Sequence, residues 1–99
     1  MDEELRKEEA EVEGTFTVLN DRGIHTRPAT ELVKCASSFK SNIMLKSQGM
    51  VVNGKSLLGI LTLMATRGTR IKVQAKGSDA GEAVDALIKL AGNQFNISY

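Results

Sequence analysis

The sequence predicts a small α+β domain, a two-layer sandwich in which helices cover one face of a mostly antiparallel sheet. A chain of 99 residues is long enough to bury one hydrophobic core. Segments that alternate apolar and polar residues, which are typical of half-buried strands, are interspersed with segments whose apolar residues recur at helical spacing. The expected order, β-α-β-β-α-β-α, contains few of the crossovers that parallel strands require, so it favours antiparallel pairing.

Four short strands are expected, over residues 15–20, 42–48, 50–52 and 70–76. The last of them, RIKVQAK, alternates without interruption, and the first, in GTFTVLN, combines alternation with β-branched residues. Gly49 separates the two middle strands.

Three helices are expected, over residues 26–39, 56–65 and 79–91. The first and last each have one apolar face, formed by Ala29, Leu32, Val33, Ala36 and Phe39, and by Ala83, Val84, Leu87, Ile88 and Ala91. Pro28 suits the first turn of a helix, where a missing amide hydrogen costs nothing, and Asp79 is expected to be an N-cap.

The charge of the chain is unevenly distributed. Residues 1–13 contain seven acidic side chains and two basic ones, whereas residues 14–99 contain eleven basic and five acidic ones. We interpret residues 1–13 as an acidic, flexible N-terminal extension and residues 14–99 as the globular domain. An alternative is that the extension folds back onto the basic body and screens it.

Composition excludes several classes of protein. Cys35 is the single cysteine, which excludes an internal disulfide and a multi-cysteine zinc site. No apolar run has the length of a signal peptide or membrane span. We therefore expect a cytoplasmic protein that acts through its surface, without a metal or another cofactor.

The stretch GMVVNGKS, residues 49–56, fits the nucleotide-binding pattern GxxxxGK[ST]. However, two adjacent valines favour extended backbone, and Asn-Gly is a strong turn sequence. A nucleotide site also needs an acid that holds Mg²⁺ at the end of another strand, and no expected strand ends in aspartate. We therefore assign Gly54 and Ser56 a local structural role.

His25 is the only histidine, and it stands at the expected start of a helix in GIHTRPAT. One interpretation is that its imidazole serves as an unusual helix cap. The other uses the unpaired amides and the partial positive charge of a helix start, which favour a bound anion. An imidazole nitrogen there can accept a phosphoryl group, with the amides of Thr26 and Arg27 facing the phosphate and the guanidinium of Arg27 binding its oxygens.

Ser56 is a second candidate for phosphate chemistry. Its expected role is to cap the helix that follows Asn53-Gly54-Lys55. A phosphate at a helix start is electrostatically tolerated, so modification of Ser56 can change the surface without unfolding the domain.

The helix over residues 56–65 is too apolar to bury every side chain in one core. Ile60 and Leu63 are expected to be buried, which leaves Leu57, Leu58 and Leu61 as a candidate docking patch. The alternative is a short helix sunk between two layers. Basic side chains near the patch would favour acidic protein partners. They are Arg22, Arg27, Lys34 and Lys55.

The motif GIHTRPAT, followed later in the chain by VNGKSLLGILTL, resembles the HPr family, the histidine phosphocarriers of the bacterial phosphotransferase system. The resemblance covers roughly residues 14–92. It implies an open-faced β-sandwich of four antiparallel strands with three helices on one face, and a monomeric carrier rather than an enzyme. It also implies that His25 is phosphorylated on Nδ1 by phosphoenolpyruvate-dependent Enzyme I, and that the phosphoryl group passes to sugar-specific Enzyme IIA proteins with the help of Arg27.

The resemblance implies further partners through Ser56, which matches the serine that an ATP-dependent HPr kinase/phosphorylase modifies in many members. A transcriptional regulator that binds the phosphoserine form is then a further partner. Three segments depart from the usual family pattern: Thr26 replaces an alanine, Leu57-Leu58 replaces Ile-Met, and Ala65-Thr66-Arg67 differs from the usual small-residue segment. Because VNGKS also resembles the nitrogen-regulatory NPr branch, the sequence leaves the branch open, and a purely regulatory relative stays an alternative.

The basic body suggests one competing class, a nucleic-acid-binding module. Such modules stack bases on aromatic side chains of a sheet. The chain offers only Phe16, Phe39, Phe95 and Tyr99. We therefore favour the phosphocarrier and expect neither nucleic acid nor membrane as a partner.

Overall fold

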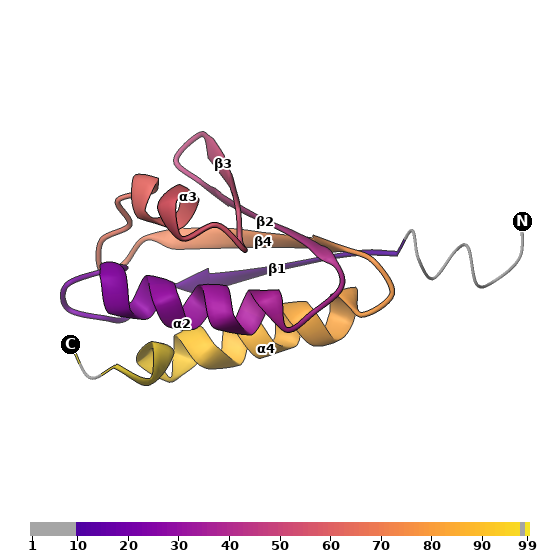
Figure 1. The fold of residues 1–99 in the computed structure, drawn as a ribbon. Helices are drawn as coiled ribbons and strands as arrows, with labels where there is room; N and C mark the ends of the chain where they lie inside the picture. Colours follow the sequence, from indigo (N-terminus) through magenta and orange to yellow (C-terminus); the bar gives the residue numbers. More distant parts are fainter. Residues whose placement is uncertain (1–9, 98) are drawn as a thin grey trace, which may run out of the picture.

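A computed structural model describes residues 10–97 and residue 99 of the chain. This part forms a four-stranded antiparallel sheet with α-helices packed on one face (Figure 1). The elements are β1 (Glu11–Thr17), α2 (Thr26–Ser37), β2 (Asn42–Ser47), β3 (Met50–Asn53), α3 (Leu57–Thr62), β4 (Arg70–Lys76), α4 (Ala80–Gly92) and the 3₁₀ turn η1 (Gln94–Asn96). The predicted α+β open-faced sandwich and its element order are confirmed.

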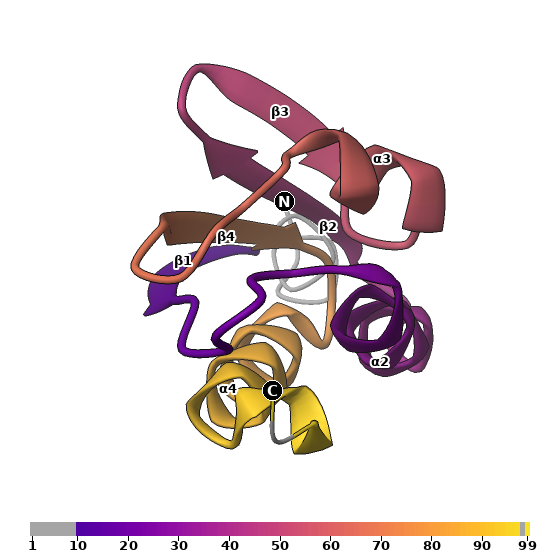
Figure 2. The same cartoon turned by 90° about the vertical axis from the view of Figure 1, so that its left-hand side faces the viewer.

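The strand order in the sheet is β1-β4-β2-β3, and every neighbouring pair is antiparallel. In β4, Ile71, Val73 and Ala75 are buried toward the helices while the residues between them point outward. This alternation leaves one face of the sheet open, and α2 and α4 lie side by side against the other (Figure 2).

The first strand both begins and ends earlier than predicted, which corrects the expected range of 15–20. β1 pairs with β4 from Glu11 opposite Lys76 to Thr17 opposite Arg70. The acidic residues fit a strand because they face the open side, where Glu13 forms an ion pair with Lys72 at 3.1 Å. Residues 11–13, which we assigned to the extension, therefore belong to the sheet, and residues 1–9 lie outside the described residues.

Helices α2 and α3 end earlier than predicted. α2 stops at Ser37, where the hydroxyl of Ser38 donates to the carbonyl of Cys35 at 2.6 Å. α3 spans only residues 57–62, because Met64 adopts a left-handed backbone with φ of 49°. The turn η1 was not predicted. Its Phe95 packs edge-on against Phe16 with ring centroids 5.9 Å apart.

Asp79 precedes α4 at the expected N-cap position, but its side chain does not cap the helix. Instead, the carboxylate accepts hydrogen bonds from the amide of Lys40 at 2.8 Å and from the amide and hydroxyl of Ser41. The predicted capping bond is therefore wrong, because the carboxylate binds the loop between α2 and β2 instead. These bonds fix the start of α4 against that loop.

Candidate functional site

His25 occupies the N-cap position of α2, with an extended backbone (φ −87°, ψ −167°). Its side chain makes no capping hydrogen bond, so the interpretation of His25 as a helix cap is wrong. The residue is half-buried, and its Nε2 atom is buried without a hydrogen-bond partner in the described part of the chain. The imidazole is therefore held at the surface with one nitrogen turned inward.

The loop before His25 is fixed by a close backbone contact with the segment after α3. Gly23 has a φ of +69°, and a side chain there would meet the carbonyl oxygen of Ala65 at 2.2 Å. Ile24 is buried, and its amide donates to that carbonyl at 2.9 Å. These constraints place His25 at the start of α2.

The first amides of α2 are oriented toward the same end of the helix as His25. Within residues 10–97 and 99, the amides of Thr26 and Arg27 donate to no backbone carbonyl, as expected for the first turn of a helix. Pro28 has no amide hydrogen, and the amide of Ala29 donates to the carbonyl of His25 at 3.0 Å. Two unpaired amides and the helix dipole thus provide an anion-binding position next to the imidazole.

The guanidinium of Arg27 and the imidazole of His25 both contact Tyr99. Arg27 is exposed, and its Nη1 atom donates to the hydroxyl of Tyr99 at 2.5 Å. The ring of Tyr99 is stacked on the imidazole of His25, with centroids 5.3 Å apart and an angle of 17° between the planes. His25, Thr26 and Arg27 follow one another at the start of α2, and the structure adds Tyr99, which sequence reasoning did not assign to the site.

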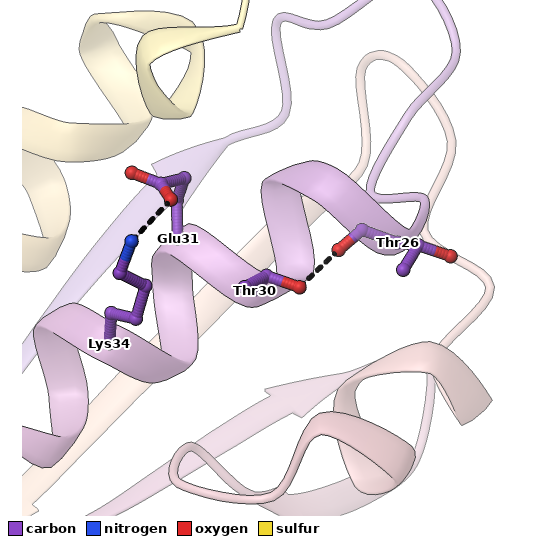
Figure 3. A network of polar contacts seen from close by, with 4 residues as sticks. All are labelled: Thr26, Thr30, Glu31 and Lys34. Carbon is purple, nitrogen blue, oxygen red and sulfur yellow. Dashed lines mark hydrogen bonds and ion pairs between the residues drawn. The ribbon is translucent and has the colours of Figure 1, made fainter.

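Hydrogen bonds along α2 restrain the side chains that follow the site (Figure 3). The hydroxyl of Thr30 donates to the carbonyl of Thr26 at 2.8 Å. One turn further along, Lys34 forms an ion pair with Glu31 at 3.3 Å (Figure 3). Because Lys34 is largely exposed and such surface pairs are weak, its ammonium stays accessible.

Ser56 caps α3, as predicted. Its hydroxyl oxygen accepts a hydrogen bond from the amide of Gly59 at 3.0 Å. The preceding segment forms a turn, in which the amide of Lys55 donates to the side-chain oxygen of Asn53 at 2.8 Å. A side chain at Gly54 would meet Cγ2 of Ile43 at 2.8 Å, so the glycine is required for close packing of the turn on β2.

The apolar surface of α3 differs in part from the predicted patch. Ile60 and Leu63 are buried as predicted, and Leu57 and Leu58 are 38% and 74% exposed. Leu61 is half-buried and packs against the core, so it contributes less than predicted. Met64, which the prediction omitted, is 80% exposed and has a left-handed backbone just after α3.

The basic side chains expected around this apolar patch have different surroundings. The ammonium of Lys55 donates to the carbonyl of Phe39 at 2.7 Å, and this bond anchors it to the loop between α2 and β2. Arg22 lies over the ring of Tyr99, with Cζ 5.5 Å from the ring centroid. α2 contacts α3, and the start of α2 lies at the end of the molecule that faces the viewer in Figure 2.

Other reactive or ligating groups lie away from this site. Burial raises the pKa of the Cys35 thiol, which disfavours the nucleophilic thiolate. Among the residues that the structure describes, no three His, Cys, Asp or Glu side chains are grouped as a metal site would require. Of the helices in this same part, none combines the length and apolar character needed to cross a bilayer.

Comparison with known proteins identifies the family. Residues 12–93 match the family described as "PTS HPr component phosphorylation site". The chain belongs to the HPr family. It is 41% identical to the phosphocarrier protein HPr of Xylella fastidiosa strain Temecula1, over 86% of this chain and 96% of that protein.

Two further relatives extend the comparison with the HPr family. The crystal structure of HPr-C-His from Thermoanaerobacter tengcongensis superposes with a TM-score of 0.84 at 36% identity, covering 89% of this chain and 99% of that one. The multiphosphoryl transfer protein of Haemophilus influenzae is 38% identical over 93% of this chain, which spans only 19% of that longer protein. These findings place the chain among the phosphocarriers of the phosphotransferase system.

Proposed function

We propose that this HPr-family protein carries a phosphoryl group on His25, accepting it from phospho-Enzyme I and passing it to Enzyme IIA proteins during sugar uptake in the cytoplasm. The observation that carries the proposal is the grouping at the start of α2. A half-exposed imidazole with no capping role stands beside two unpaired amides and an exposed guanidinium. This grouping can receive, stabilise and release a dianionic group.

Nδ1 of His25 is the proposed acceptor atom, and the burial of Nε2 supports this choice. The Nδ1 lone pair attacks phosphorus and forms a P–N bond. The bond between phosphorus and the donor atom of Enzyme I breaks, and its electron pair stays on the donor. Transfer to Enzyme IIA repeats the exchange with His25 as the donor, so the carrier is not consumed and is not itself an enzyme.

The chain's own groups stabilise charge during both exchanges. The amides of Thr26 and Arg27 face the phosphoryl oxygens, and the guanidinium of Arg27 adds a permanent positive charge. Phosphoryl transfer requires mainly alignment and charge stabilisation, so a partner enzyme can supply any metal or base.

Partner proteins dock, in this proposal, on the surface beside His25. Leu57 and Leu58 supply exposed apolar contacts, with a smaller contribution from half-buried Leu61. Arg27 and Lys34 supply exposed positive charge. Apolar centres with a charged rim suit acidic partner surfaces that bind transiently.

Phosphorylation of Ser56 by an HPr kinase/phosphorylase is the proposed means of regulation, with a transcriptional regulator as a reader of the modified form. Ser56 starts the helix that bears Leu57 and Leu58, so a phosphate there changes the charge of the docking surface. An NPr-like role in the nitrogen branch uses the same chemistry at His25 with different partners.

Labelling with radioactive phosphoenolpyruvate and Enzyme I tests the proposal. The wild-type chain should acquire an acid-labile phosphate, His25→Ala should acquire none, and Ser56→Ala should be labelled as fully as the wild type. Full labelling of His25→Ala would contradict the assignment. Which Enzyme IIA protein then accepts the labelled phosphoryl group would distinguish the sugar branch from the nitrogen branch.

A further inference from the structure

Tyr99 contacts three side chains at the proposed phosphoryl site. Its ring stacks on His25, with centroids 5.3 Å apart, and its hydroxyl accepts a hydrogen bond from Arg27 at 2.5 Å. The guanidinium carbons of Arg22 and Arg27 each lie 5.5 Å from the ring centroid. One aromatic side chain therefore links the imidazole to two permanent positive charges.

The segment that carries Tyr99 is anchored in the core. Phe95 is fully buried against Phe16, and Ile97 is buried as well. The side-chain amide of Asn20, itself fully buried, donates to the carbonyls of Gln94 at 2.9 Å and Ile97 at 3.0 Å. These contacts hold η1 and Ile97 in place. Tyr99 lies against the start of α2 through its contacts with His25 and Arg27.

The stack leaves the reactive direction of the imidazole open. The lone pair of an imidazole nitrogen lies in the plane of the ring, and a phosphoryl donor must approach along that plane. The rings of Tyr99 and His25 are within 17° of parallel, so Tyr99 covers a face of the imidazole rather than the edge that bears the lone pair. The contact therefore fixes the orientation of the ring without blocking the reaction.

The hydroxyl contact restrains Arg27 in the same way. An exposed arginine side chain loses considerable rotamer freedom when it must bind a phosphate. The bond from Nη1 to the Tyr99 hydroxyl holds the guanidinium near His25 before a phosphoryl group arrives. The charge-assisted bonds that Arg27 can then form to phosphate oxygens are stronger than a bond to a neutral phenol.

We propose that Tyr99 is a positioning residue of the phosphoryl site, which orients the His25 imidazole through its ring and the Arg27 guanidinium through its hydroxyl. The inference rests on the proposed function of His25. The ring and the hydroxyl of Tyr99 thus have separate roles. Substitutions that remove only the hydroxyl, or the whole side chain, can therefore separate the effect on Arg27 from the effect on His25.

The test measures the rate of phosphoryl transfer from phosphorylated Enzyme I to the full chain. Tyr99→Phe, which keeps the ring, should slow transfer about 2- to 10-fold, the effect expected from one lost hydrogen bond. Tyr99→Ala should slow it severalfold more. In an Arg27→Ala background, Tyr99→Phe should have no further effect, because the partner of the hydroxyl is already absent, whereas Tyr99→Ala should still slow transfer.

Two further readouts separate positioning from a general loss of structure. The imidazole proton resonances of His25 should show the ring-current shift of a stacked aromatic in the wild type and in Tyr99→Phe, and lose it in Tyr99→Ala. Lys89→Ala, an exposed position on α4, serves as the control and should leave both transfer and the His25 resonances unchanged.

The possible outcomes distinguish this inference from the proposed function. If the wild type is not phosphorylated by Enzyme I, the proposed function fails. If the wild type is phosphorylated but both Tyr99 variants react at its rate, the positioning role fails. Faster transfer in Tyr99→Ala would also overturn it, because that result would show that the ring obstructs the site.

Discussion

The carboxylate of Asp79 binds Ser41 twice, through the backbone amide at 2.9 Å and through the hydroxyl. Its second oxygen accepts from the amide of Lys40 at 2.8 Å. Gly77 lies against the same residue, because a side chain there would meet the hydroxyl oxygen of Ser41 at 2.6 Å. This cluster connects the end of β4 and the start of α4 with the loop that leads into β2.

Replacement of Asp79 should therefore destabilise the fold. We expect Asp79→Ala to lower the free energy of unfolding by about 1.5–3 kcal/mol, the usual effect of losing hydrogen bonds to a charged group. Asp85→Ala, at an exposed position of α4, is the control and should change it by less than about 0.5 kcal/mol. Urea denaturation measures the free energy of unfolding of both variants. Equal stabilities of Asp79→Ala and Asp85→Ala would contradict the structural role of Asp79.

Asp79 should also make stability depend on pH in the acid range. The hydroxyl of Ser41, followed by the amide of Lys40, lowers the pKa of this carboxyl below its ordinary value of 3.8. Because the folded pKa is lower than the unfolded one, the contribution is complete above the ordinary value and is lost as pH falls through the folded pKa. The stability difference between the wild type and Asp79→Asn should thus be constant near neutral pH and shrink below about pH 4. A stability difference that grows on acidification would show that folding does not lower the pKa of Asp79.

The cap of α3 predicts the effect of changes at Ser56. Ser56→Ala should lower the free energy of unfolding by about 1 kcal/mol, because the amide of Gly59 loses its acceptor. Ser56→Asp, which retains a capping oxygen, should recover most of this loss. Thermal denaturation of both variants checks the prediction, and equal losses in both would argue against the capping bond.

Arg27 should affect transfer but not folding. Its side chain is exposed, so Arg27→Ala should change stability by less than about 0.5 kcal/mol. Loss of a charge-assisted bond to the phosphoryl group should slow transfer from Enzyme I by about 10- to 100-fold. Arg27→Lys should recover part of the rate, since it keeps the charge but not the planar fork. An unchanged rate in Arg27→Ala would remove this residue from the site.

The exposed part of α3 should determine how well partners dock. Leu58 is 74% exposed, so Leu58→Asp should leave the fold intact while raising the KM for transfer from Enzyme I. Val51→Asp, which introduces the same charge at another exposed apolar position, on β3, is the control. Equal effects of the two changes on KM would indicate a general charge effect rather than docking through α3.

Local sequence patterns predicted the four strands, the three α-helices, most of the buried residues on α2 and α4, and the place of His25 at the start of a helix. They misplaced the start of β1, because the acids at Glu11 and Glu13 resemble a solvated tail until their pairing with β4 is known. They also missed Tyr99. It reaches the site through contacts with residues more than 70 positions away in the chain, such as Arg27, and such contacts leave no local periodicity.

The most direct test of the carrier assignment follows one sample through a complete cycle by intact mass spectrometry. After incubation with phosphoenolpyruvate and Enzyme I, the chain should gain the mass of one phosphoryl group, which fragmentation should locate on His25. Addition of an unphosphorylated Enzyme IIA acceptor should restore the original mass. A phosphoryl group that resides on another residue, or one that stays on His25 in the presence of every acceptor, would contradict the account.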